Sequence, residues 1–104
     1  MTDDTTPIRI LIADDHAIVR EGIRHVFRQA PGFEVVAEAA SGDQALAMAR
    51  DQVPDVAVLD ITMPGMTGLQ VAAALHEELP GVRAVILSMH DNPEYVLEAV
   101  RAGA

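Results

Sequence analysis

Four polar side chains end apolar runs of the sequence, where they could do chemistry together. Asp14 and Asp15 follow one such run, Asp60 ends another, and Ser88 ends a third. Crowded carboxylates repel one another, and the usual reason to tolerate this is a hard cation with oxygen ligands. A bound Mg²⁺ would neutralise the carboxylates and also an incoming phosphoryl group, whose transfer depends on positioning and charge neutralisation. We therefore expect an acyl phosphate on Asp60.

The apolar runs before these side chains predict the strands of a parallel sheet. Runs 8–13, 56–59 and 84–87 are short and largely continuous, which is typical of strands covered on both faces, so we expect them to be central. Residues 33–38 mix apolar and acidic side chains and predict an edge strand. Ligands of an open parallel sheet bind outside the carboxyl ends of its strands. The four polar side chains should therefore converge on one rim.

Helical patterns separate the runs. Apolar residues recur at helical spacing in two segments: Val19, Ile23, Val26 and Phe27, then Val71, Ala72, Leu75 and Leu79. Capping boxes are predicted at Ser41 and Thr67, each with glutamine three residues later, and an N-cap at Asn92 precedes a proline. Proline–glycine pairs at 31–32 and 80–81 predict helix ends. Strand and helix alternate four times, which predicts one α/β domain over residues 1–104 with a doubly wound parallel sheet.

Each polar residue taken alone also has a purely structural interpretation. Asp14 or Asp15 could complement the dipole of the following helix, and Ser88 could be an ordinary residue at a strand end. The combination of all four at strand ends favours the functional interpretation.

The histidines are expected at solvated helix or loop positions. They are His16, His25, His76 and His90. Their spacing brings no metal or phosphohistidine centre together. His16 lies closest to the acidic pair, where it could affect access of the cation or the phosphodonor.

Composition excludes several classes of protein. The 104 residues, half of them hydrophobic, suit one domain, and the net charge of -9 from 16 acidic and 7 basic residues would repel nucleic acid and anionic membranes. Cysteine is absent, so no disulfide is possible. Residues 1–6 do not resemble a secretory signal, and no apolar stretch reaches membrane-spanning length. We expect a cytoplasmic protein.

Three segments together resemble response regulator receiver domains of two-component systems, and their residues are similar to those of the NarL/FixJ branch. They are Leu-Ile-Ala-Asp-Asp-His at 11–16, Leu-Asp-Ile-Thr-Met-Pro-Gly-Met-Thr-Gly at 59–68 and Leu-Ser-Met-His-Asp at 87–91. The resemblance implies a flavodoxin-like (CheY-like) sheet of strand order 2-1-3-4. It implies that Asp60 is the phosphoacceptor and Ser88 the switch hydroxyl. It also implies that Mg²⁺ is bound by Asp14, Asp15, Asp60 and the backbone carbonyl of Thr62.

The same resemblance implies partners. A sensor histidine kinase would be the phosphoryl donor, and DNA would be contacted only through an output domain that is not in this chain. The chain would not be an enzyme, beyond weak Mg²⁺-dependent self-phosphorylation and dephosphorylation.

The family pattern breaks after Ala104, where a fifth strand and helix are expected. That strand carries a lysine and an aromatic switch residue; this chain has no lysine, and Tyr95 lies on the preceding helix. The chain is expected to be a shortened piece of a longer regulator or a natural truncation. We expect an open sheet edge beside the last strand, self-association as a dimer or by exchange of the final helix, and slow or undetectable phosphorylation by small phosphodonors. Normal acyl-phosphate formation would contradict the last expectation.

Two other functions stay open. The chain could be an interaction module that dimerises without phosphorylation, which the missing fifth unit favours. It could also be a phosphotransferase or phosphatase of the haloacid-dehalogenase class, but those sites resemble Asp-x-Asp, and Asp60-Ile61-Thr62 lacks the second acid.

Overall fold

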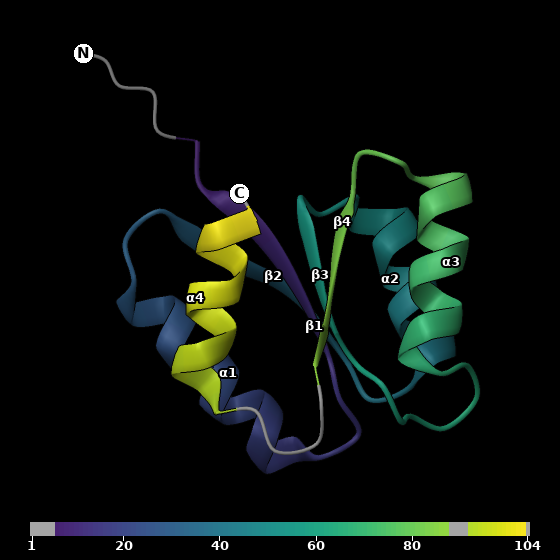
Figure 1. Cartoon of the computed structure of the whole chain (residues 1–104), viewed down its shortest axis with the longest axis horizontal. Coiled ribbons are helices and arrows are strands. Elements are labelled where there is room, and N and C mark those ends of the chain that lie inside the picture. Colours follow the sequence, from purple (N-terminus) through teal and green to yellow (C-terminus); the bar gives the residue numbers. More distant parts are fainter. Residues whose placement is uncertain (1–5, 88–91, 104) are drawn as a thin grey trace.

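The structure, a computed structural model, describes residues 6–87 and 92–103, in which strands and helices alternate (Figure 1). The strands are β1 (Ile8–Ala13), β2 (Phe33–Ala39), β3 (Val56–Asp60) and β4 (Arg83–Leu87). The helices are α1 (Ala17–Gln29), α2 (Gly42–Gln52), α3 (Gly68–Glu78) and α4 (Pro93–Gly103). None of the described helices combines the length and the apolar character needed to cross a membrane.

The four strands form one parallel sheet in the order β2-β1-β3-β4. This order and the edge position of β2 confirm the prediction. The apolar pattern of run 84–87 predicted a central strand, which is wrong for the described residues, because β4 pairs there with β3 alone. The open edge that was expected beside this strand from the missing fifth unit is present in those residues. Ala84, Val85 and Ile86 consequently keep part of their surface exposed, whereas every residue of β3 is buried.

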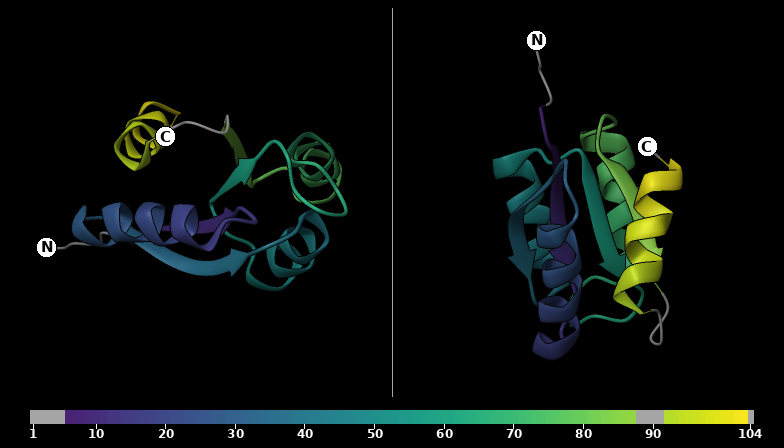
Figure 2. Two further views of the ribbon diagram at one scale, coloured as in Figure 1. Left: turned by 90° about the horizontal axis from the view of Figure 1, so that it is seen from below. Right: turned by 90° about the vertical axis from the view of Figure 1, so that its left-hand side faces the viewer.

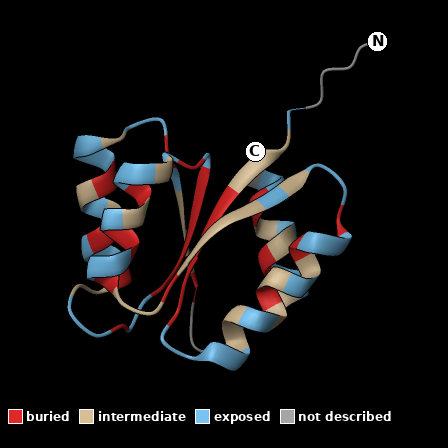
Figure 3. Cartoon of the chain, turned by 180° about the vertical axis from the view of Figure 1, so that it is seen from behind, coloured by how far each residue is buried: buried red, intermediate tan, exposed pale blue. Residues whose placement is uncertain are grey.

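The alternation of side chains along the strands divides the core between the two faces of the sheet. Ile10 and Ile12 of β1 pack with residues of α1 and α4, while Leu11 and Ala13 pack with residues of α2 and α3. Figures 1 and 2 show the two helix pairs on opposite sides of the sheet, and Figure 3 shows the buried strands between helices with exposed outer faces. A sheet covered on both faces explains its continuous apolar runs.

The predicted helix faces and helix starts are mostly confirmed. Apolar positions of the two predicted faces are buried at Ile23, Phe27, Val71 and Leu75. Both halves of the capping box are present at Thr67, and the Asn92 side chain accepts a hydrogen bond from the Tyr95 backbone at 2.9 Å, with Pro93 beginning α4.

The capping box predicted at Ser41 is only half correct. The Ser41 hydroxyl accepts the backbone N–H of Gln44, but the Gln44 side chain accepts the N–H of Ala40 instead of that of Ser41. The side chain therefore stabilises the turn one residue earlier than a capping box would.

Candidate functional site

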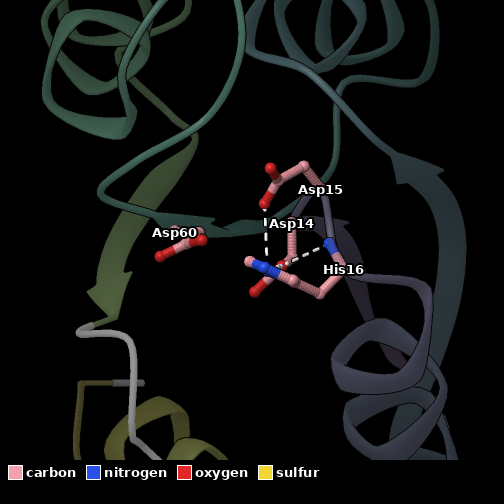
Figure 4. A group of neighbouring side chains, drawn as sticks. All are labelled: Asp14, Asp15, His16 and Asp60. Carbon is pink, nitrogen blue, oxygen red and sulfur yellow. Dashed lines mark hydrogen bonds and ion pairs between the residues drawn. The ribbon is translucent and has the colours of Figure 1, made fainter.

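The predicted convergence of carboxylates occurs at the carboxyl ends of β1 and β3. Ala13 pairs with Leu59 across these strands, so the next residues, Asp14 and Asp60, lie side by side where β1 and β3 end. One ligand atom from each of Asp14, Asp15, His16 and Asp60 lies within 4.8 Å of the others (Figure 4). Asp14, His16, Val19 and Asp60 line a pocket of about 130 Å³ there.

Asp60 is a buried carboxylate with one unpartnered oxygen among the described residues. Its residue is 3% exposed, and its Oδ1 has no hydrogen-bond partner among the described residues. Burial raises the pKa of the Asp60 carboxyl above its ordinary value, and the charge of Asp14 adds to this, while the backbone amides of Thr62 and Ile61 act in the opposite direction. A positive charge in the pocket would stabilise the ionised form of Asp60.

His16 belongs to this cluster. The sequence predicted that His16 lies closest to the acidic pair, but it did not predict a position within the cluster. Its Nδ1 lies 3.1 Å from Oδ1 of Asp14 and 3.0 Å from Oδ1 of Asp15, and its backbone N–H donates to Asp14 Oδ1 at 2.8 Å. The hydrogen bond to Asp14 raises the pKa of the His16 imidazole, and the charge of Asp15 raises it further. The side chain is still 62% exposed, so the expectation of a solvated position is correct in that limited sense.

A tight turn explains why His16 folds back over the acidic pair. His16 is the N-cap of α1, with extended backbone, and its side chain caps no helical N–H. Arg20, one turn into α1, donates to the backbone carbonyl of Asp14 at 2.6 Å and fixes the turn against the helix. The signal in the sequence was the position of His16 directly after Asp15, but only the turn geometry directs its ring toward the carboxylates.

Close backbone packing holds the loop after Asp60. Gly68 donates its N–H to the carbonyl of Ile61 at 2.9 Å, and a Cβ at Gly68 would collide with the backbone of Asp60. Ile61 in turn donates to the carbonyl of Leu87 at 3.2 Å. The loop is therefore hydrogen-bonded to α3 and to the end of β4, which fixes the position of Asp60 at the rim of the sheet.

The loop after Asp60 bends at residues 64–66. Gly65 has a φ of 76°, in the left-handed region that favours glycine, and it lies against the carboxylate of Asp43. Met63 is buried in the core between the sheet, α2 and α3, and the partly buried Met66 packs against the same core.

The remaining candidates are placed as follows. Thr62 lies exposed in the loop directly after Asp60. Ser88 and His90 fall outside the described residues. His25 and His76 are exposed and take no part in the cluster.

Comparison with known proteins gives one consistent family. The model for the response regulator receiver domain matches residues 10–104. The probable transcriptional regulatory protein NarL of Mycobacterium tuberculosis is 43% identical over 98 residues, which are 93% of this chain and 45% of that protein. The chain thus spans less than half the length of the curated relatives it matches.

Solved structures agree with the sequence relatives. The receiver domain of NarL from Mycobacterium tuberculosis superposes with a TM-score of 0.78 at 40% identity, covering 94% of this chain and 79% of that one. A chain of the CheX–CheY–BeF₃–Mg²⁺ complex from Borrelia burgdorferi superposes with a TM-score of 0.75 at 27% identity, covering 94% and 74%.

Proposed function

Because the chain belongs to the response regulator receiver domain family, we propose that Asp60 accepts a phosphoryl group from a sensor histidine kinase, with Mg²⁺ held beside it. The observation that carries this proposal is the buried Asp60 carboxylate, which has one unpartnered oxygen and lies within a single cluster with Asp14 and Asp15. A buried charge without compensation costs stability and is retained where a function needs it.

The donor set fits a hard divalent cation. Asp14, Asp15 and Asp60 contribute carboxylate oxygens, and we propose the backbone carbonyl of Thr62 as a further ligand. A similar chain occurs in a complex with BeF₃ and Mg²⁺, which supports the same chemistry here. When bound, the cation would neutralise charge on the carboxylates and on the phosphoryl oxygens.

The acceptor step follows from the character of Asp60. An ionised carboxylate oxygen forms the new O–P bond while the N–P bond of the donor phosphohistidine breaks, and the leaving imidazole takes up a proton from solvent. The backbone contacts of the loop after Asp60 hold this carboxylate in a fixed position at the rim of the sheet. A fixed position favours the reaction, because positioning and charge neutralisation dominate phosphoryl transfer. No amino acid of this chain needs to act as a base in that step.

Ser88 is proposed as the group that responds to phosphorylation. Leu87 pairs with Asp60 in the ladder between β3 and β4, and Ser88 is the next residue of the chain. A hydroxyl donates readily to the acceptor oxygens that a phosphoryl group adds. The conformational response would then run through residues 88–91 toward α4, as a shift between two existing states.

The relatives point to a transcriptional output. The matched relative is a transcriptional regulatory protein more than twice as long as the match. We propose that residues 1–104 act as the receiver domain and that DNA is contacted by an output domain elsewhere in the complete protein, since the net charge of -9 opposes direct binding of nucleic acid.

One observation favours a second candidate, dimerisation without phosphorylation. Among residues 6–87 and 92–103, β4 has a strand partner on one side only, and its apolar residues Ala84, Val85 and Ile86 are partly exposed. An open edge of this kind favours association with a second copy. This candidate needs the fold but not the acidic cluster.

Beryllofluoride separates the two candidates, because it mimics a phosphoryl group on a carboxylate. We expect a bound-fluoride ¹⁹F NMR signal in the unsubstituted protein with Mg²⁺, and none in Asp60→Asn. Asp51→Asn is the matched control, since Asp51 is an exposed aspartate on α2 outside the cluster. Equal signals in Asp60→Asn and in the control would contradict the phosphoacceptor role.

A further inference from the structure

His16 offers the carboxylate cluster a ligand of a different kind. Its Nδ1 approaches Asp14 Oδ1 and Asp15 Oδ1 at 3.1 and 3.0 Å, from the turn that joins β1 to α1. Nδ1 of the imidazole therefore faces the cluster, while most of the side chain is exposed (Figure 4).

These separations match the edges of a metal coordination sphere. Ligands about 2.1 Å from an octahedral cation are about 3.0 Å apart when adjacent and about 4.2 Å apart when opposite. The imidazole nitrogen already has the adjacent spacing to each of the two aspartate oxygens, and the whole group of four ligand atoms spans no more than 4.8 Å. Little movement would be needed for all four to reach one ion.

A second observation points independently to a ligand in this place. Oδ1 of Asp60 is buried and has no hydrogen-bond partner among the described residues, and Asp60 lines the same small pocket as Asp14 and His16. An unpartnered buried carboxylate oxygen is costly unless something positive fills the space beside it.

We propose that His16 binds the cation through Nδ1 and thereby shifts the site toward first-row transition-metal ions such as Co²⁺, relative to Mg²⁺. Carboxylate and carbonyl oxygens alone suit Mg²⁺, whereas imidazole nitrogen favours the transition metals. This inference rests on the proposed cation site but adds a residue and a selectivity to it. His16 is then a specificity-determining ligand of the site and not a bystander.

The competing arrangement makes the opposite prediction. If the His16 ring only occupies the place of the cation, removing it should strengthen binding of every divalent ion alike. If His16 is a ligand, removing it should weaken Co²⁺ selectively. The two arrangements therefore predict opposite changes in Co²⁺ affinity when the His16 ring is removed.

Calorimetric titrations of Mg²⁺ and Co²⁺ with His16→Ala test the selectivity. They are run at pH 8, because a nitrogen must be free of its proton to bind metal. We expect Co²⁺ affinity to fall about tenfold or more, on the scale of losing a metal-site group, while Mg²⁺ affinity changes much less. His76→Ala is the matched control, since His76 is an exposed histidine outside the cluster, and His16→Asn retains a residue that favours the N-cap.

Pulsed EPR with Mn²⁺ gives a direct readout of ligation. We expect ¹⁴N modulation from a bound imidazole in the unsubstituted protein and in His76→Ala, and its loss in His16→Ala. Mn²⁺ bound without ¹⁴N modulation, or stronger binding of all ions by His16→Ala, would overturn the role of His16 alone. A protein that binds none of the three ions would overturn the cation site itself, together with the role of His16.

Discussion

The Asp60 carboxylate links the stability of the fold to the function of the site. Asp60 is 3% exposed and lies beside Asp14, and Oδ1 of Asp60 has no hydrogen-bond partner among the described residues. The same burial and repulsion that would be relieved by a cation destabilise the protein when no cation is present.

Asp60→Asn should therefore stabilise the cation-free protein. We expect the free energy of unfolding in EDTA at pH 7 to rise by about 1–3 kcal/mol, the range for removing an uncompensated buried polar group. Urea denaturation measures it, with Asp51→Asn as the exposed control. An unchanged or lower stability for Asp60→Asn would contradict a destabilising effect of the buried Asp60 charge.

The stability gain should disappear in acid. The pKa of Asp60 is raised by folding above the ordinary 3.8, so the folded state binds its proton more tightly than the unfolded state. The free energy of unfolding contributed by Asp60 consequently falls as pH rises from below 3.8 through the raised pKa, and the penalty is complete above it. Denaturation of both proteins as a function of pH should show their difference vanishing below pH 3.8.

His16 shows where prediction from individual residues stops. Asp14, Asp15 and Asp60 were predicted as a group because each follows a buried strand, a rule that depends only on the order of residues. The direction of the His16 ring depends on the turn between β1 and α1, and on the bond from Arg20 that fixes it. That information is geometric, so spacing alone suggested a solvated histidine.

At the scale of elements, α3 positions the site through its first residue. A Cβ at Gly68 would meet the carbonyl oxygen of Asp60 and the backbone of Ile61, neither of which can move independently of β3. The glycine thus permits α3 to start directly beneath the loop that follows the acceptor.

Gly68→Ala should damage both the fold and the site. We expect it to lower the free energy of unfolding by about 1–3 kcal/mol, as overpacking usually does, and to weaken beryllofluoride binding because the Asp60 backbone must shift. Gly81→Ala is the control, because a Cβ there meets nothing within 4 Å. Equal stabilities and equal beryllofluoride affinities for the two variants would contradict the positioning role of Gly68.

The elements themselves were largely predictable from the sequence, with two instructive exceptions. The buried runs and the caps at Thr67 and Asn92 identified strands and helix starts, because both signals are local. Whether a strand is central depends on its neighbours, so the apolar run of β4 did not reveal its edge position. The Gln44 side chain accepts the N–H of Ala40 and not that of Ser41, and residue spacing alone cannot distinguish these two adjacent donors.

At the scale of the whole molecule, the two edges of the described sheet differ in character. β2 carries Glu34 and Glu38 among its apolar residues, and Glu38 binds Arg24 of α1 at 2.8 Å, whereas β4 has a single charged residue, Arg83. Charged side chains discourage pairing at an edge, and apolar ones permit it. The β4 edge is therefore the place where two copies should meet.

A protein of these 104 residues should associate through that edge. We expect sedimentation velocity to detect a dimer whose fraction rises with protein concentration. The measurement is made at about 0.15 M salt, because screening over a Debye length of about 8 Å weakens the repulsion between the acidic chains. Compact monomer alone at high concentration would refute the association.

A crystal structure of the chain with Mn²⁺ and BeF₃⁻ tests the central claim most directly, because anomalous scattering identifies the cation and its ligands. We expect one Mn²⁺ bound by Asp14, Asp15 and Asp60, with beryllium bonded to an Asp60 carboxylate oxygen. Mn²⁺ bound away from these aspartates, or BeF₃⁻ bonded to another residue while Asp60 stays free, would contradict it.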